Sequence, residues 1–285
     1  MPQAMKINSL TGADPFFREY MSQDAILKYT RGTAGFGISY LLDHDYKQVY
    51  LDAIKRLPQQ IVHDGIRVLE FGCGGGMNLL HLVAVLNRDG YNIDSAIGTD
   101  FSHVLIEAAN KEAQSYLTSQ QRSRVQFCVA KNETLLEDLS AGLGKERSGL
   151  ENRFHFIIGV NTIRYCHRAG KQLDCARDIF NLLAPGGVCV VIDMNDRFPA
   201  FRSALKNKFR GKSNREEECY LPSLEEYSEP FERTGFEVLR SEHFCWVPHS
   251  GGPFLTRVLC TLTPLLNAVA RSRAMRSLVV ARKPS

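Results

Sequence analysis

The sequence lacks paired cysteines and long apolar runs. Its eight cysteines form no Cys-x-x-Cys pair, and some, such as Cys128 and Cys189, stand in apolar strand-like segments where a thiol acts as a small hydrophobic side chain. No stretch of about 18 consecutive apolar residues is present to span a bilayer, and residues 1–6 carry no apolar signal core. These absences predict a reduced, cytoplasmic protein without a disulfide framework, a metal site or stable membrane insertion.

The chain as a whole also lacks a strong charge of one sign. Its formal net charge is +4, and its 44% hydrophobic and 23% charged residues are those of an ordinary globular protein. No basic domain is present, so nucleic acid is not an expected partner. The exception is local, because Arg197 to Arg215 contains seven basic residues and no acidic one. This run is either a solvated face, neutralised by Glu216, Glu217 and Glu218, or a site for a phosphate, a carboxylate or an acidic surface.

Glycine, in contrast, is concentrated after a short apolar strand. Gly72, Gly74 and Gly76 can turn the chain sharply and bring its backbone close to a ligand, because glycine has no Cβ. A nicotinamide-binding fingerprint would need glycine or alanine at position 77, where the sequence has Met77. Glu70, just before the first glycine, would repel a pyrophosphate. The pattern therefore favours a ligand that carries an amino group over a dinucleotide.

With this loop, the chain resembles the class I S-adenosylmethionine-dependent methyltransferases, whose first motif is acidic-x-Gly-x-Gly-x-Gly. The resemblance covers the chain from residue 65 to its C-terminus. It implies an α/β fold, a Rossmann-like doubly wound sheet of seven mostly parallel strands with an antiparallel last strand. The further landmarks are Asp100 at the end of a second strand, 24 residues beyond Gly76, the helix, Pro-Gly-Gly turn and fifth strand in 180–193, the turn into a sixth strand in 234–238, and a seventh strand in 276–283.

The resemblance implies S-adenosyl-L-methionine as the cofactor, S-adenosyl-L-homocysteine as its product, and a set of cofactor contacts. Asp100 is expected to bind the ribose diol. Asn132 is expected near the adenine, in a segment where many family members carry Gly-Asp, and His155 stands where an aspartate is common. The implied cofactor-binding residues are Glu70, Gly72, Cys73, Gly74, Gly76, Asp100, Phe101, Asn132 and Asn161.

Candidates for the transfer step follow the fourth strand, because ligands of doubly wound sheets gather at the carboxyl ends of the strands. His167 has a suitable intrinsic pKa for a general base, and a solvated loop histidine is the alternative interpretation. The strand is followed by Asn-Thr-Ile-Arg rather than Asn-Pro-Pro-Tyr, which disfavours methylation of adenine or glutamine nitrogens. The catalytic candidates are His167, Tyr165 and Asn161, with Asp193 beside them by position and His243 and His249 behind them.

Additions to the family's core are expected to determine substrate choice. Residues 1–63 are interpreted as a helical lid over the cofactor, in which Tyr29, Arg31 or Tyr40 faces the substrate, and a flexible linker is the alternative. Within this segment, an apolar stripe from Tyr46 to Leu57 predicts a helix that packs on the core.

The core itself is expected to occupy residues 64–285, with insertions at 196–222 and 250–274. In the latter insertion, apolar residues repeat at intervals of three and four, and Pro264 is expected to kink the helix. Packing on the domain is the first expectation for this helix, ahead of a dimer face or a wall for a lipid-like or prenyl acceptor.

Together these features predict an enzyme, an S-adenosylmethionine-dependent methyltransferase that promotes in-line attack by a small-molecule acceptor. The acceptor is expected to be hydrophobic or anionic, of natural-product, lipid-like or prenyl type. The protein must mainly orient the acceptor and exclude water, and a general base is needed only if the acceptor keeps its proton until attack. A nicotinamide-dependent oxidoreductase and a noncatalytic methyltransferase-like binding protein are the alternatives, and a homodimer stays open.

Overall fold

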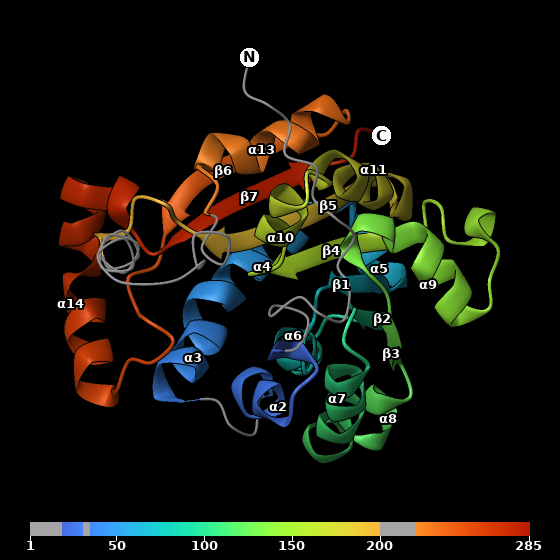
Figure 1. Ribbon diagram of the computed structural model, residues 1–285, viewed down its shortest axis with the longest axis horizontal. Coiled ribbons are helices and arrows are strands. Elements are labelled where there is room, and N and C mark those ends of the chain that lie inside the picture. The colour runs from blue at the N-terminus through green and yellow to red at the C-terminus, as the bar shows by residue number, and fades with distance from the viewer. Residues whose placement is uncertain (1–18, 31–34, 200–220) are drawn as a thin grey trace.

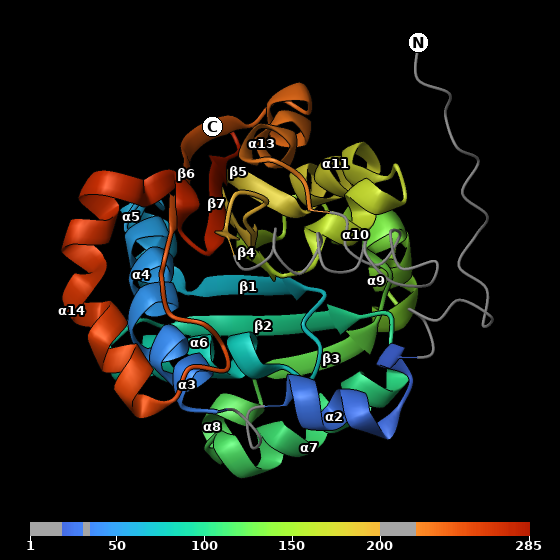
Figure 2. The same cartoon turned by 60° about the vertical axis from the view of Figure 1, so that its left-hand side comes forward.

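The computed structural model of the protein describes residues 19–30, 35–199 and 221–285. Within them, a sheet of seven strands in the order β3-β2-β1-β4-β5-β7-β6 runs through the molecule (Figures 1 and 2). The predicted Rossmann-like α/β fold is thus confirmed. The strands are β1 (Ile66–Phe71), β2 (Ile93–Asp100), β3 (Val125–Val129), β4 (Phe154–Val160), β5 (Leu183–Met194), β6 (Glu237–Phe244) and β7 (Arg276–Arg282).

The direction of the strands agrees with the resemblance. The pairs formed among β1 to β5 are parallel, whereas β7 is antiparallel to both β5 and β6. Because β7 runs against β5, its first residue, Arg276, pairs with Met194, the last residue of β5. Arg276 therefore lies at the carboxyl edge of the parallel strands, where such folds bind their ligands.

Helices cover both faces of the sheet, and each face has its own apolar cluster. Successive residues of a strand point to opposite faces, so Val68 joins one cluster and Leu69 the other. The first cluster includes α4 (Lys47–Ile54), α6 (Met77–Arg88) and α7 (His103–Tyr116), and the second includes α9 (Leu135–Leu143), α10 (Ile163–Arg168), α11 (Gln172–Leu182) and α13 (Leu224–Arg233). Shorter helices are α2 (Gln23–Tyr29), α3 (Phe36–Leu41), α5 (Gln59–Asp64) and α8 (Ser119–Arg122).

The described parts of the N-terminal segment are largely helical, and α4 joins the core. Helix α3 continues through a π-helical turn, Leu42–Tyr46, into α4. The side chains of Tyr46, Tyr50 and Ile54 are 2%, 1% and 0% exposed, which confirms that the predicted apolar stripe packs on the domain. Helix α2 lies against α7, at the edge of the sheet that carries the glycine loop (Figure 2).

The insertion between β6 and β7 contradicts the expectation of packing. It forms one long helix, α14 (Pro253–Ala270), with Pro264 inside it, and Thr256 is its only buried residue. The face that meets the domain carries Thr256, Leu259 and Cys260, while most of the apolar stripe faces outward. By length and composition, residues Pro253–Arg273 could cross a membrane, with a mean hydropathy of 1.3 and 6% burial.

The insertion at 196–222 lies largely outside the described residues. Of the basic run, only Arg197 is described, and its backbone N–H donates to Asn195 Oδ1 over 2.9 Å. Arg31, a predicted substrate residue, also lies outside the described part of the chain.

Candidate functional site

The glycine loop between β1 and α6 is shaped by close backbone contacts. Gly72 has φ +63°, and a Cβ there would stand 2.0 Å from Thr162 Oγ1. Gly76, which precedes α6, has φ +80°, and its Cβ would stand 2.9 Å from the Phe127 ring. Both the left-handed backbone and the lack of space require glycine at these positions. The loop is therefore held tightly against the start of the segment that follows β4.

Glu70, at the end of β1, is fully buried beside this loop. Its Oε2 accepts the backbone N–H of Leu79 over 2.9 Å, whereas its Oε1 is buried without a hydrogen bond of normal geometry among the described residues. Burial raises the pKa of Glu70 well above its ordinary value, against the opposing effects of the Leu79 N–H and the Asn78 side chain. A buried acceptor of this kind is expected to have a donor partner.

Asp100, at the end of β2, binds the loop from the other side. Its Oδ2 accepts the N–H of Gly74 and its Oδ1 accepts the N–H of Ser102, each over 2.9 Å. Burial raises its pKa to about 6, although the two N–H groups favour the charged form. Cys73, between the glycines, donates its N–H to Thr99 O over 2.7 Å. The loop, β1 and β2 thus form one hydrogen-bonded unit.

The N-terminal helix α2 lies directly on the glycine loop. A Cβ at Gly75 would stand 2.7 Å from the Tyr29 carbonyl oxygen, and a Cβ at Gly74 would stand 3.4 Å from Tyr29 Cβ. The chain is tied there by Ser102, whose hydroxyl donates to the carbonyl of Tyr20 over 2.6 Å. Phe101 approaches the same tyrosine, with ring centroids 5.6 Å apart. These contacts hold α2 against the loop, and a role as a lid over the cofactor stays a prediction.

The segment after β4 meets both the loop and β3. Asn132 Nδ2 donates to Thr162 Oγ1 over 2.6 Å, which leaves the Asn132 carbonyl oxygen available to another donor. Asn161 has a left-handed backbone with φ 55°, an uncommon conformation for a residue other than glycine. Its N–H donates to Ile192 O over 2.7 Å. Such conformations cluster at functional sites, where surrounding contacts enforce them.

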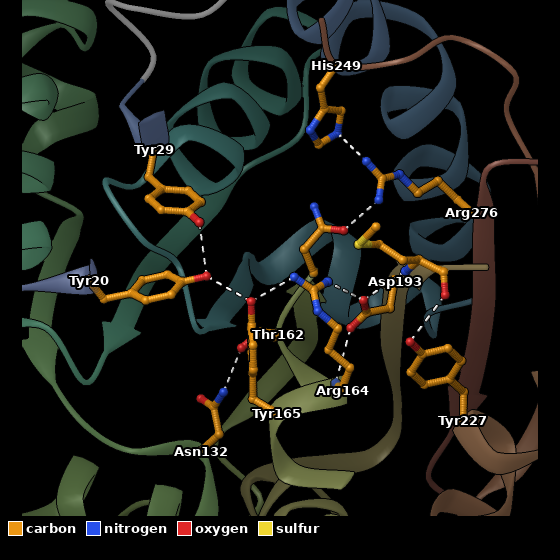
Figure 3. A network of polar contacts seen from close by, with 12 residues as sticks. Tyr20, Tyr29, Asn132, Thr162, Arg164, Tyr165, Asp193, Tyr227, His249 and Arg276 are labelled. Atoms are coloured by element: carbon orange, nitrogen blue, oxygen red, sulfur yellow. Dashed lines mark hydrogen bonds and ion pairs between the residues drawn. The ribbon is translucent and has the colours of Figure 1, made fainter. Parts of the chain in front are cut away.

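A chain of polar contacts crosses the edge of the sheet, as Figure 3 shows. Tyr29 donates to Tyr20 over 3.0 Å, and the hydroxyls of Tyr20 and Tyr165 are 2.8 Å apart. Arg164 donates to the Tyr165 hydroxyl over 2.8 Å and to Asp193 Oδ1 over 2.7 Å. Burial and the neighbouring tyrosines raise the pKa of Tyr20. Burial opposes the charge of Arg164, but Asp193 together with the neighbouring tyrosines raises the pKa of Arg164.

Arg276 forms a second polar centre beside this chain. It is 4% exposed and donates to Asn161 Oδ1 over 2.8 Å and to His249 Nε2 over 2.7 Å. Burial first, then Arg276 and Arg164, lower the pKa of His249 to about 2, so its ring is neutral and accepts at Nε2. Within the described residues, the Arg276 Nε has no acceptor and no carboxylate forms an ion pair with the guanidinium. A buried cation without an anion is costly.

The other predicted residues lie elsewhere. His167 contacts the ring of Tyr227 edge-on, with centroids 5.6 Å apart, and burial lowers its pKa. Tyr40 stacks on His44, with centroids 4.4 Å apart, rather than in the tyrosine chain. His243 lies 3.3 Å from the Ser277 hydroxyl. His155 stands at the start of β4, where its Nε2 lies 2.8 Å from an Arg67 nitrogen, at the opposite edge from the glycine loop.

Four residues of the site were not predicted, namely Tyr20, Thr162, Arg164 and Arg276. Arg276 had a usable signal, because an arginine that begins an antiparallel strand beside β5 must stand at the ligand edge. Thr162 and Arg164 belong to the predicted segment after β4, but nothing in the sequence separates them from their neighbours. Across the described ranges, no group of three or more His, Cys, Asp or Glu side chains is placed to hold a metal ion.

Comparison with known proteins gives a match to one domain family and several solved structures of similar fold. The profile of a methyltransferase domain matches residues 42–241, and no curated protein matches the chain. Among solved structures, the [4+2]-cyclase SpnF is similar with a TM-score of 0.54 and 19% identity, over 84% of this chain and 80% of that one. A SAM dependent methyltransferase from Aquifex aeolicus has a TM-score of 0.51 and 15% identity, over 86% and 92%.

The CMeT domain of the citrinin polyketide synthase is also similar, with a TM-score of 0.57 and 18% identity. That match covers 95% of this chain, which spans only 58% of the other. At such identities, the likeness to solved structures shows the fold alone. The match to the domain profile reaches further, because it covers most of the chain and includes β1 to β5 with the glycine loop. The chain therefore belongs to the methyltransferase-domain family.

Proposed function

We propose that the protein transfers a methyl group from S-adenosylmethionine to a small-molecule acceptor. The observation that carries the proposal is the glycine loop, whose Gly74 N–H donates to Asp100. The loop adjoins the buried Glu70 carboxyl, whose Oε1 has no hydrogen bond of normal geometry among the described residues. An ammonium group would give this oxygen a donor with normal hydrogen-bond geometry. A pyrophosphate would instead add negative charge beside two carboxyl groups, which disfavours the nicotinamide alternative.

The residues of the loop fit the parts of this cofactor. Glu70 would hold the ammonium group of its methionine part, and Asp100 would hold the ribose hydroxyls through lone pairs that Gly74 and Ser102 leave unused. The carbonyl oxygen of Asn132 would accept from the adenine amino group. When bound, the cofactor supplies an activated methyl group on a sulfonium. The protein's own task is then to orient the acceptor and exclude water.

We further propose that the acceptor carries an anionic group, which the polar edge of the sheet binds. Arg276 offers its unpartnered Nε there, and Tyr165 and Tyr20 offer hydroxyls nearby. An acceptor carboxylate or comparable anion would compensate the buried guanidinium. The small-molecule class of acceptor and the in-line geometry of transfer are parts of this proposal.

Orientation, rather than proton removal, is the proposed contribution of these side chains. His249 has a pKa of about 2 and is occupied by Arg276. Burial raises the pKa of Tyr20 and of Tyr29, and the carboxylate of Asp193 is engaged by Arg164. A group with a pKa far from neutral is a poor general base. The site therefore suits an acceptor whose nucleophilic atom is already electron-rich or easily deprotonated.

Calorimetric titration tests the cofactor first. We expect the purified protein to bind S-adenosylmethionine and S-adenosylhomocysteine and not NAD(H). Asp100→Ala removes the ribose contact and should weaken binding by about 1–3 kcal/mol, the usual loss for a hydrogen bond to a charged group. The matched control is Asp94→Ala on the same strand, where the side chain is 56% exposed, and its affinity should not change.

The transfer step needs a separate readout. Incubation with cofactor carrying a labelled methyl group and a panel of carboxylated, hydroxylated and neutral small molecules should label acidic acceptors preferentially. Selective NAD(H) binding would contradict the cofactor assignment. Cofactor binding without labelling of any acceptor in the panel would favour the noncatalytic alternative.

We also propose the cytoplasm as the location of the protein. In the part of the chain that the structure describes, the cysteines are free thiols, six of them buried. Free cysteines in this number suit a reducing compartment.

A further inference from the structure

Helix α14 presents its apolar side chains to the solvent. Phe254, Val269, Leu265 and Leu255 are 82%, 71%, 60% and 46% exposed. In both ribbon views the helix lies along the outer edge of the molecule, beyond α3 and β6 (Figures 1 and 2). An apolar stripe on a surface helix normally faces the core. Exposed apolar patches of this kind mark interaction sites rather than ordinary surface.

The inner face of α14 already has its partners. Thr256 is 1% exposed, and Leu259 and Cys260 pack against the edge of the first apolar cluster. The hydroxyl of Thr263 donates to Leu259 O within the helix over 2.8 Å. Trp246, in the segment that leads to the helix, donates to Asn267 Oδ1 over 2.8 Å. These contacts fix the rotation of the helix about its axis. The outward apolar side chains therefore cannot turn toward the domain without breaking them.

The charges on the segment that carries this stripe are all positive. From residue 243 to the C-terminus the sequence has six arginine and lysine residues and no aspartate or glutamate. Arg257 lies within the helix, and Arg271 and Arg273 follow its end. Glu242 pairs with Arg271 over 2.5 Å, but among the described residues Arg257 and Arg273 form no ion pair. An apolar stripe flanked by arginines is typical of helices that bind anionic lipid.

We propose that α14 docks the protein on an anionic lipid bilayer, with the helix in the plane of the interface. Its 18 residues span about 27 Å, but both of its ends are tied to the domain. Before it, His249 accepts from Arg276 of β7 over 2.7 Å, and after it the N–H of Met275 donates to Cys245 O. Since Cys245 and Met275 stay buried beside the sheet, the helix cannot cross the bilayer without pulling β6 from β7.

The positive charges of this segment favour a lipid surface over a second copy of the chain as the partner of α14. Two α14 helices packed face to face would bring the same arginines together, with no acidic residue on either segment to compensate them. Anionic headgroups supply the missing negative charge, while the acyl region takes the apolar side chains. The docking surface does not depend on methyl transfer, and its test uses no cofactor or acceptor.

Vesicle co-flotation of the full chain tests the proposal. We expect binding to vesicles of phosphatidylcholine mixed with phosphatidylglycerol, weak binding to phosphatidylcholine alone, and a loss of binding at high salt. Trp246 is the only tryptophan in the sequence, so its emission should change when anionic vesicles are added. Equal binding to both lipid mixtures, or no binding to either, would overturn the proposal.

Surface variants link the binding to α14. The triple change Phe254→Ser, Leu265→Ser and Val269→Ser should reduce partition into anionic vesicles by at least about tenfold, because it removes exposed apolar area that would enter the lipid. The matched control is Leu27→Ser, since Leu27 on α2 is 65% exposed. Its binding should equal that of the wild type. Unchanged binding of the triple variant would count against the docking surface.

Two further experiments test the role of the arginines and the possibility of self-association. The double change Arg257→Gln and Arg273→Gln should weaken binding to the anionic mixture while leaving the weak binding to phosphatidylcholine unchanged. Sedimentation velocity without lipid should show the same mass for the wild type and for the triple serine variant. A dimer that dissociates only in the triple variant would show that a second copy covers the stripe, and would refute the lipid assignment.

Discussion

Single residues of the site are set in environments that their neighbours determine. His249 is the clearest case, because it is buried against Arg276 and cannot accept a proton without opposing a permanent cation. Gly72 is comparable in a steric sense, since Thr162 occupies the space of any side chain there. In both cases a residue distant in the sequence sets the limit, on protonation at His249 and on side-chain size at Gly72.

The buried histidine makes the stability depend on pH. The pKa of His249 is about 2 in the folded protein against an ordinary value of 6.5. As the pH falls below 6.5, the unfolded chain gains a proton that the folded state does not, so stability is lost. Between pH 7.5 and 5.5, the free energy of unfolding of the wild type should fall by about 1 kcal/mol more than that of His249→Gln. Urea titrations at both pH values measure this, and parallel curves would contradict it.

At the scale of elements, two of the helices, α7 and α13, are capped by a serine side chain at their first turns. Ser102 caps α7, accepting the N–H of Leu105 over 3.3 Å, and its hydroxyl also holds the segment that leads to α2. Ser223 caps α13 in the same way, accepting the N–H of Glu226 over 3.2 Å. Ser102 therefore holds both a helix and the segment before α2, whereas Ser223 holds a helix alone.

The two caps form a matched pair of variants. Ser102→Ala and Ser223→Ala should each lower the free energy of unfolding by about 1 kcal/mol, the usual cost of a lost cap. Only Ser102→Ala should also weaken the binding of S-adenosylhomocysteine, because it releases the Tyr20 carbonyl that ties the segment before α2 to the end of β2. Denaturation and calorimetry of both variants measure the two effects. Equal affinities would show that the tie to Tyr20 does not affect the cofactor site.

At the scale of the whole molecule, the sheet joins all parts of the described chain. The cofactor strands β1 and β2 and the strands β6 and β7 that carry α14 belong to the same sheet. We therefore expect one cooperative unfolding transition rather than separate ones. The far-ultraviolet circular dichroism and the emission of Trp246, beside α14, should give the same midpoint. An earlier transition in Trp246 emission would contradict this expectation.

Bound cofactor should move the two midpoints together. At a concentration of S-adenosylhomocysteine a hundredfold above its dissociation constant, the folded state gains about 2.7 kcal/mol. For a protein of this size, that corresponds to a rise of about 4 °C in the melting temperature.

Much of the fold could be predicted from the sequence, because its signals are local. The apolar strand before Gly72, the acidic residue at Asp100 and the Pro-Gly-Gly turn each report on a few adjacent residues. The order of such segments identified the family and its sheet. The side chains around the acceptor site were harder to predict, because Tyr20, Arg164 and Arg276 come together only through the topology of the sheet.

The orientation of α14 was also beyond the sequence. Apolar residues at intervals of three and four predict a helix with one apolar face, and this helix exists. The same periodicity does not say whether that face meets the domain or the surroundings. Here the domain receives only the side of the helix that carries Thr256, Leu259 and Cys260, so the expectation of packing was wrong for most of the apolar side chains.

The placement of α14 has a consequence for the folding of the sheet. Phe244 of β6 pairs with Arg276 of β7, so residues 245–275 form a single closed loop between two adjacent antiparallel strands. Compared with a tight hairpin of a few residues, closing this loop costs roughly 2 kcal/mol more in chain entropy. The pairing of β6 with β7 therefore changes from a local event to one between distant segments, which slows folding. A version with a short turn between these strands should fold faster than the natural chain.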